Sequence, residues 1–105
     1  MKKVRTMERL QTEHVYTGKG RQRAVFLRPD TTEMRFGVEL LQGDEGVVEV
    51  SYDPVEMVRR GRGEWCVFEG GLGGSLHSVT AIRLNIRHVD GWMKLFIEQG
   101  VHGNG

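Results

Sequence analysis

The clearest alternation of apolar and polar residues runs from residue 33 to residue 42. Its apolar members are Met34, Phe36, Val38 and Leu40, and a period of two predicts a strand with one buried face. A second alternation at 47–53 contains Val48, Val50 and Tyr52. A loop at 42–46 would pair Leu40 with Val48 and place both apolar faces on one side, so the sequence predicts a hairpin.

A second hairpin is predicted from residue 79 to residue 99. Asp90-Gly91 stands near its middle, and this dipeptide is typical of a two-residue hairpin turn. The turn would join a long strand at 79–89 to a strand that follows it. The resulting register pairs His88 with Met93, Ile86 with Leu95, and Leu84 with Ile97, and the last two pairs are apolar on both strands.

One short helix is predicted at about 54–60. Asp53 can cap it, Pro54 suits its first position, and Gly61 fits its end. Shorter strands are predicted at 14–17, 24–28 and 64–69, and residues 3–10 suit a helix or a strand. The glycine-rich stretch 70–75 is predicted to be a loop.

These elements predict a mainly β (or α+β) fold, with about six antiparallel strands in a small barrel or sandwich and one short helix. Their order resembles that of an OB-fold barrel, and a sandwich or a sheet completed by dimerisation fits it equally well. No motif identifies a family. The length of 105 residues predicts one domain, 1–105, with residues 1–12 extended or flexible and residues 100–105 frayed.

The composition indicates the cellular compartment in which we expect the protein. Its single cysteine, Cys66, excludes an intramolecular disulfide, and its place in the predicted strand at 64–69 favours a buried, structural thiol. The basic start is followed by no long apolar stretch, so we expect neither a signal peptide nor a membrane partner. We therefore expect a cytoplasmic protein.

Charge is unevenly distributed along the chain. Residues 1–28 carry eight Lys and Arg against two acids, whereas residues 29–58 carry one Arg against eight acids. Blocks of this kind can bind a charged partner, or they can face each other within one fold.

The second face of the 79–99 hairpin combines cations with aromatic rings. Its members are Arg83, Arg87, Trp92, Lys94 and Phe96. Like charges opposite each other are unfavourable unless something neutralises them, and phosphates can do so while bases stack on the rings. The first hypothesis is therefore a non-enzymatic binding domain for a phosphate-bearing ligand, either single-stranded nucleic acid or a nucleotide.

The same face has a second interpretation as a core or as a protein interface. Trp92 and Phe96 could lie inside a sandwich. The 33–53 hairpin could also lie beside this face, because it would place Glu39 opposite Glu49, a like-charge pair of the other sign. Contact between the two faces across chains predicts a protein-interaction module, either a homo-oligomer or a small inhibitor of a larger partner.

Other candidate sites are weaker. Arg59, Arg60 and Arg62 form a secondary basic cluster that could bind phosphate or could complement the end of the helix. The four histidines show no metal-ligand spacing among themselves or with Cys66. We therefore expect no enzymatic activity, no metal and no cofactor.

Overall fold

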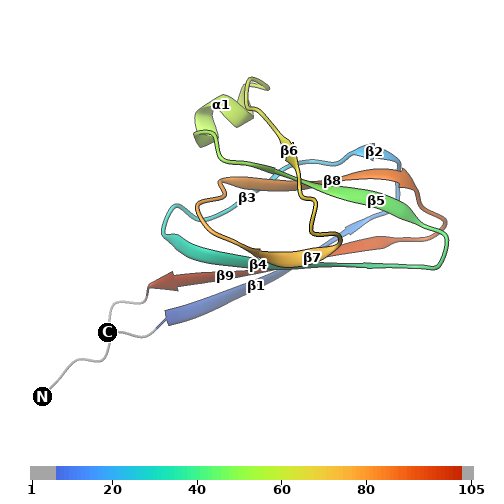
Figure 1. The fold of residues 1–105 in the computed structure, drawn as a ribbon, viewed down its shortest axis with the longest axis horizontal. Coiled ribbons are helices and arrows are strands. Elements are labelled where there is room, and N and C mark those ends of the chain that lie inside the picture. The colour runs from blue at the N-terminus through green and yellow to red at the C-terminus, as the bar shows by residue number, and fades with distance from the viewer. Residues whose placement is uncertain (1–6, 103–105) are drawn as a thin grey trace, which may run out of the picture.

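A computed structural model describes residues 7–102 of the chain (Figure 1). The strands in this range are β1 (Met7–Tyr16), β2 (Gly20–Arg21), β3 (Val25–Phe26), β4 (Thr31–Leu40), β5 (Glu45–Ser51), β6 (Cys66–Val67), β7 (Gly73–Leu76), β8 (Ala81–His88) and β9 (Met93–His102). The single helix is α1 (Val55–Arg59). The predicted mainly β class and the short helix near 54–60 are confirmed, and short edge strands raise the number of strands above the six expected.

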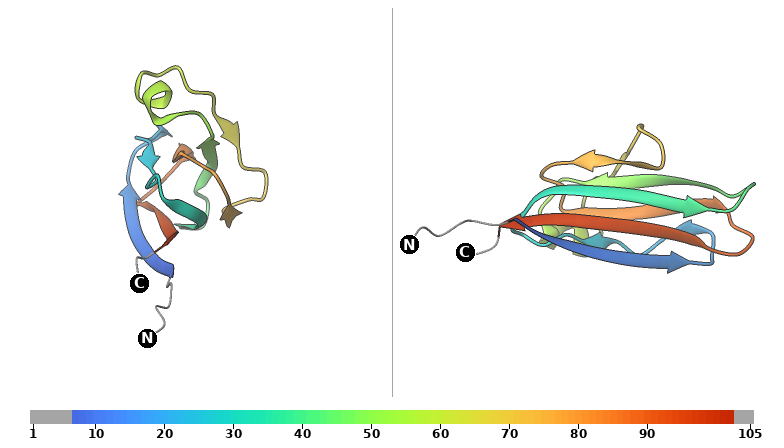
Figure 2. Two further views of the ribbon diagram at one scale, coloured as in Figure 1. Left: turned by 90° about the vertical axis from the view of Figure 1, so that its left-hand side faces the viewer. Right: turned by 90° about the horizontal axis from the view of Figure 1, so that it is seen from below.

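The strands form two antiparallel sheets that lie face to face (Figure 1, Figure 2). Sheet A has the strand order β1-β9-β4-β7. Sheet B has β8 and β5 at its centre, with β6 along one edge and β2 and β3 along the other. Within the described range no strand pairing joins the sheets, so the architecture is a sandwich and not a closed barrel.

Both predicted hairpins are wrong, because the two strands of each predicted hairpin belong to different sheets. β4 pairs with β9 and β7, whereas β5 pairs with β8 and β6. Likewise β8 and β9 belong to different sheets, although Asp90-Gly91 lies between them. The connections at 41–44 and 89–92 therefore cross from one sheet to the other.

The core lies between the sheets and contains the apolar faces that the alternation predicted. Leu84 and Ile86 of β8 share it with Leu95 and Ile97 of β9, and each of these four is at most 2% exposed. Burying one such side chain stabilises the fold by about 1.5–3 kcal/mol. The residues that would have been ladder partners in a hairpin thus meet from opposite sheets.

The sequence predicted the end of helix α1 correctly and its beginning incorrectly. Pro54 occupies the N-cap position, and no side chain caps the helix. The Asp53 carboxylate, which was expected to cap it, instead accepts a hydrogen bond from the Glu64 backbone N–H, with an N–O distance of 2.6 Å. Gly61 follows the helix with a φ of +72°, as expected of a C-terminal stop, and Val58 anchors the helix with 8% exposure.

The glycine-rich stretch predicted to be a loop supplies the edge strand β7. Gly73 and Gly74 pair with Gly37 and Phe36 of β4. The ring of Phe68 covers Gly74 so closely that a Cβ there would lie 2.6 Å from Phe68 Cζ. The same ring meets Phe36 edge to face, with centroids 4.9 Å apart. Glycine at position 74 therefore leaves room for the aromatic ring that closes this side of the core.

The outer parts of the chain form strands where the structure describes them, which agrees with the extended alternative for residues 7–12 and differs from the fraying expected after residue 99. β1 includes residues 7–12, and β9 continues to His102, so residues 100–102 pair with β1 and β4 instead of fraying. The predictions for residues 1–6 and 103–105 lie outside the described residues.

Candidate functional site

The five residues predicted to bind a phosphate-bearing ligand do not share one face. Arg83 and Arg87 belong to β8 in sheet B, whereas Lys94 and Phe96 belong to β9 in sheet A, with Trp92 just before β9. The alternate residues of both strands fill the core, so these side chains point outward on opposite sides of the sandwich. The prediction of a single basic and aromatic face is wrong, because the chain crosses between the sheets at residues 89–92.

Arg83 is held in an ion pair within the chain. Its Nε lies 2.6 Å from Oε1 of Glu49, its cross-strand neighbour on β5, and the Glu49 side chain is only 7% exposed. The Arg83 guanidinium also stacks on Trp65, 4.0 Å from the ring centroid. Asn85 donates to the other oxygen of Glu49, with an N–O distance of 3.4 Å. The charge of Arg83 is therefore neutralised and covered.

Glu39 and Glu49, which the hairpin would have placed opposite each other, lie in different sheets. Glu39 is exposed on β4 opposite Lys94, and Glu49 is buried on β5 opposite Arg83. Each acid has a cation as its cross-strand neighbour, which is a favourable arrangement. Of the two acids, Glu49 forms an ion pair within the chain, and Glu39 is exposed.

The secondary basic cluster is exposed at the end of α1. Arg59, Arg60 and Arg62 all face solvent, and the Arg59 guanidinium lies 5.2 Å from the ring centroid of Phe26. Binding of phosphate by this arginine cluster stays a prediction.

Cys66 is exposed, and the prediction of a buried thiol is therefore wrong. The reason is that β6 is a two-residue edge strand, and both of its residues are exposed.

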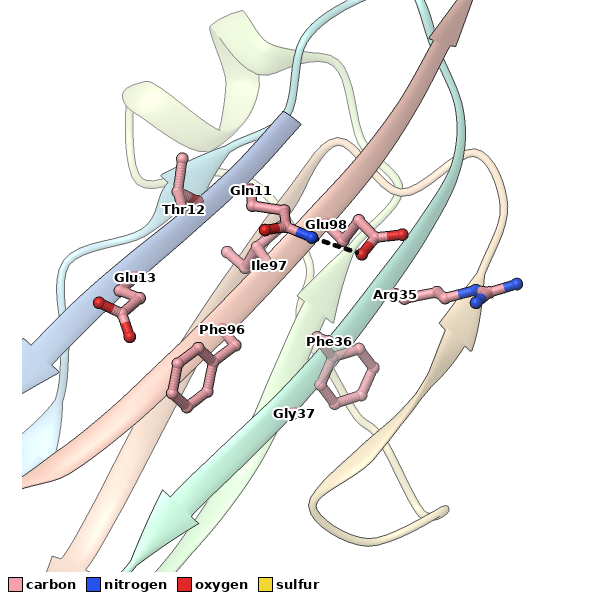
Figure 3. Close-up of a pocket in the computed structure, with 9 residues that line it drawn as sticks. All are labelled: Gln11, Thr12, Glu13, Arg35, Phe36, Gly37, Phe96, Ile97 and Glu98. Atoms are coloured by element: carbon pink, nitrogen blue, oxygen red, sulfur yellow. Dashed lines mark hydrogen bonds between the residues drawn. The ribbon is translucent and has the colours of Figure 1, made fainter. Parts of the chain in front are cut away.

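The outer face of sheet A carries a groove of about 560 Å³ (Figure 3). Outward side chains from three neighbouring strands line it: Gln11 and Glu13 of β1, Phe96 and Glu98 of β9, and Arg35 of β4. Gly37 lies opposite Phe96 in the ladder, and the space above its Cα is open. Because position 37 has no side chain, the sheet beside the Phe96 ring is left uncovered.

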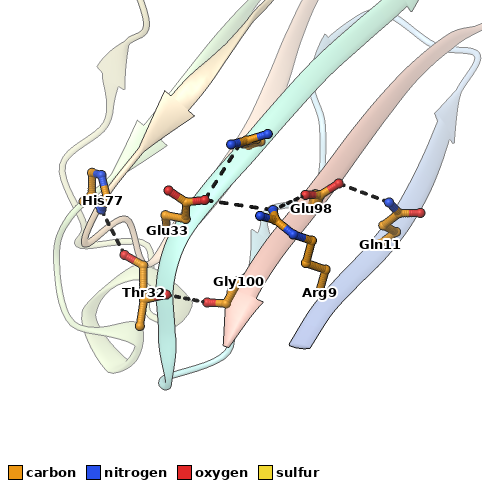
Figure 4. A network of polar contacts seen from close by, with 8 residues as sticks. Arg9, Gln11, Thr32, Glu33, His77, Glu98 and Gly100 are labelled. Carbon is orange, nitrogen blue, oxygen red and sulfur yellow. Dashed lines mark hydrogen bonds and ion pairs between the residues drawn. The ribbon is translucent and has the colours of Figure 1, made fainter. Parts of the chain in front are cut away.

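A network of polar contacts crosses the same face (Figure 4). Gln11 donates to one oxygen of Glu98 at 3.1 Å, and Arg9 donates to the other at 2.5 Å. These two hydrogen bonds hold the pKa of Glu98 below its usual value. Glu33 lies 4.0 Å from Arg9 and 3.9 Å from Arg35. Between residues 9 and 100, Glu13 is an outward acid of this face without an ion pair.

The edge of sheet A formed by β1 is long and regular. Its register with β9 is continuous over ten residues, from Met7 opposite His102 to Tyr16 opposite Met93. In the described part of the chain no strand pairs with its other side. Natural sheet edges are commonly protected by charged side chains (lysine above all), proline, a bulge or short length. β1 carries charged residues such as Arg9 and Glu13, but it has no proline, lysine or bulge and is ten residues long, whereas the strands at the other edges are two to four residues long.

Comparison with known proteins assigns no family. No protein-family model matches the chain, and no curated protein matches it. A solved chain from Bacillus endospore appendages, described as a novel family of disulfide-linked pili, is similar at 11% identity and a TM-score of 0.45. The similarity covers 94% of this chain and 92% of that one. In residues 7–102 no helix is long and apolar enough to cross a membrane.

Proposed function

We propose that this chain is a protein-interaction module that associates with a second copy of itself by pairing the outer edges of β1. The observation that carries the proposal is the ten-residue edge, which is continuous, unbulged and without proline or lysine. Such an edge can accept another strand, because main-chain hydrogen bonds supply affinity. Antiparallel pairing of two β1 strands would join two copies of sheet A about a two-fold axis.

The sequence of β1 is complementary to itself when two copies run antiparallel with Gln11 opposite Gln11. Arg9 of each copy then lies opposite Glu13 of the other, and Leu10 lies opposite Thr12. Cross-strand pairs of opposite charge contribute roughly 0.2–1 kcal/mol each. Centring the pairing on Leu10 or Thr12 removes both Arg9–Glu13 pairs, so charge selects the register centred on Gln11.

Arg9 can make this contact without leaving Glu98. Its Nη1 already donates to the Glu98 carboxylate, and a guanidinium has five N–H groups in a planar fork. Arg9 would thus bridge Glu98 of its own chain and Glu13 of the second copy. This arrangement gives Glu13 the cation that the described residues of one chain do not supply.

Recognition of single-stranded nucleic acid or a nucleotide stays a prediction. It relied on cations and rings sharing one face, and the separation of β8 from β9 removes that support. Self-association draws on an edge that is present in the single chain, so it is the function that the geometry supports best.

Sedimentation equilibrium from micromolar to millimolar concentration tests the proposal, with the 11.9 kDa monomer as the reference mass. We expect a reversible dimer. Glu13→Lys should weaken dimerisation by on the order of 10-fold, because it turns two attractive cross-strand pairs into repulsive ones. Glu69→Lys is the matched control, because it makes the same charge change at an exposed residue between β6 and β7.

A monomer at every concentration would overturn self-association and leave a larger protein partner as the alternative. Equal dimerisation by Glu13→Lys and Glu69→Lys would show that any dimer forms at another surface. Circular dichroism of both variants checks that each retains the fold.

A further inference from the structure

Two connections between the sheets meet at one end of the sandwich. Residues 41–44 join β4 to β5, and residues 89–92 join β8 to β9 (Figure 1). The backbone N–H of Asp90 donates to Oδ1 of Asp44, with an N–O distance of 3.0 Å. Leu41 also lies against Gly91, where a Cβ would come within 3.3 Å of Leu41 Cδ1. Side chains that are distant in the sequence are therefore held together here.

Asp44 is buried at this meeting point. It ends a turn in which its N–H donates to the Leu41 carbonyl at 3.1 Å, and Gly43 adopts a φ of +92° that glycine tolerates. The residue is only 7% exposed, and its Oδ2 is buried without a hydrogen-bond partner among the described residues. A buried carboxylate oxygen without a partner is costly. A cation is the natural partner of such an oxygen.

Two further ligand-type side chains lie beside Asp44. Nε2 of His88 is 3.1 Å from Oδ1 of Asp90. A shift of register in the β5–β8 ladder places His88 opposite Glu45, the residue that follows Asp44. One ligand atom each from Asp44, His88 and Asp90 lies within 4.8 Å of the other two.

We propose that Asp44, His88 and Asp90 form a binding site for a divalent transition-metal ion, with Zn²⁺ as its representative. Zinc binds imidazole nitrogen and carboxylate oxygen at about 2.0–2.2 Å, and a tetrahedron of such bonds holds its ligand atoms about 3.3 Å apart. The His88–Asp90 distance of 3.1 Å is already close to that spacing. Two carboxylates balance the charge of the ion, and the imidazole favours zinc over Mg²⁺ and Ca²⁺, which prefer oxygen alone.

The exposure of the three side chains suits an ion that enters from solvent. The side chains of His88 and Asp90 are 45% and 72% exposed, whereas Asp44 is buried. The open side leaves a fourth position for water. The contact between His88 and Asp90 involves two of the three groups, and it leaves Oδ2 of Asp44 without a partner.

The site uses no residue of β1, so it does not depend on the proposed self-association. A bound ion would join the connection that follows β4 to the connection that follows β8. It would therefore fasten both crossings between the sheets at this end of the sandwich.

Isothermal titration of the full chain with Zn²⁺, and absorption spectra with Co²⁺, test the site. We expect one ion per chain, a rise in the unfolding temperature on binding, and Co²⁺ bands typical of low coordination number. His88→Ala and Asp90→Asn should each weaken binding by at least about 10- to 100-fold, the cost known for losing even an outer-shell partner. Asp90→Asn keeps the backbone N–H that ties the two connections.

His77→Ala is the matched control, since His77 is an exposed histidine that contacts Thr32 through Nδ1 and lies outside the cluster. Cys66→Ser is a second control, because Cys66 is an exposed thiol. Both should bind Zn²⁺ as the unaltered chain does. Absence of binding at micromolar Zn²⁺, undiminished binding by His88→Ala, or equal affinity for Ca²⁺ would each overturn the proposal.

Discussion

Glu49 and Arg83 stand 34 residues apart in the sequence and lie opposite each other in sheet B, with Oε1 and Nε 2.6 Å apart. Their side chains are 7% and 17% exposed. Arg21 is the next cation, with its Nε 3.8 Å from the same oxygen, and its side chain is largely exposed. The stability of the pair therefore depends mainly on Arg83.

Arg83→Ala should lower the free energy of unfolding by about 3 kcal/mol, because it leaves the buried Glu49 carboxylate without its close partner. Urea denaturation measures this change. Arg87→Ala serves as the control, since Arg87 is exposed on the same strand, and it should change stability by no more than about 0.5 kcal/mol. Equal losses in the two variants would contradict a special role for the Glu49–Arg83 pair.

The free energy of unfolding should fall in acid because of Glu98. Hydrogen bonds from Gln11 and Arg9 lower its pKa from the ordinary value of 4.5. A carboxyl whose pKa is lower in the folded state stabilises the fold above its ordinary pKa, and this contribution disappears as pH falls through the folded pKa. Urea denaturation between neutral pH and acid should therefore show the unaltered chain losing its advantage over Glu98→Gln.

Glu39→Gln is the control for removing one negative charge from the same face, at a residue on β4 that is exposed. Titration of the Glu98 side-chain carboxyl carbon by NMR gives a direct check. A midpoint above 4.5 would contradict the hydrogen-bonded state of Glu98 seen in the structure.

Hydrogen exchange should reveal the proposed pairing of β1 at the level of single amides. Alternate backbone N–H groups of an edge strand face away from its ladder partner, so in β1 they should exchange quickly in dilute protein. They should become protected as protein concentration rises, because pairing with a second copy satisfies them. Amides of β7, the opposite edge of sheet A, should not respond.

In the same experiment on Glu13→Lys, protection should appear only at about 10-fold higher protein concentration, in line with the weaker dimer. Protection of β1 at every concentration would mean that the edge is covered within one chain. Concentration-dependent protection in β7 alone would move the interface to the other side of the sheet.

The sequence predicted which faces are buried and failed to predict which strands are neighbours. Leu84, Ile86, Leu95 and Ile97 are buried as their alternation indicated. The alternation is satisfied equally by a hairpin and by two strands that face each other across a core, because both arrangements hide the same side chains. Asp90-Gly91 favours a tight turn, yet the connection spans the two sheets and carries a tie to Asp44.

The β1 edge was difficult to predict for a different reason. Its residues lie at the side of the sandwich, where the inward positions are only partly covered: Thr12 is exposed, and His14 and Tyr16 are half-buried. A strand with so little apolar contrast has a weak period of two. The strand at 14–17 was predicted, and its extension back to Met7 appears only once β9 is in place beside it.

The cluster of Asp44, His88 and Asp90 was missed because spacing within the sequence does not show it. His88 and Asp90 stand close together, but Asp44 comes from another connection, brought near by the pairing of β5 with β8. Metal-ligand motifs are recognisable when ligands share one helix or one loop. A site assembled from two inter-sheet connections requires the correct strand order first.

The position of β9 also determines when the protein can fold. β9 lies between β1 and β4, although it comes after every other strand in chain order. During synthesis β1 therefore emerges before its ladder partner, and it stays unpaired until β2 to β8 have been made. Contacts of such long range slow folding, and waiting strands are prone to aggregate. A nascent chain thus exposes both edges of β1 to other chains until β9 follows.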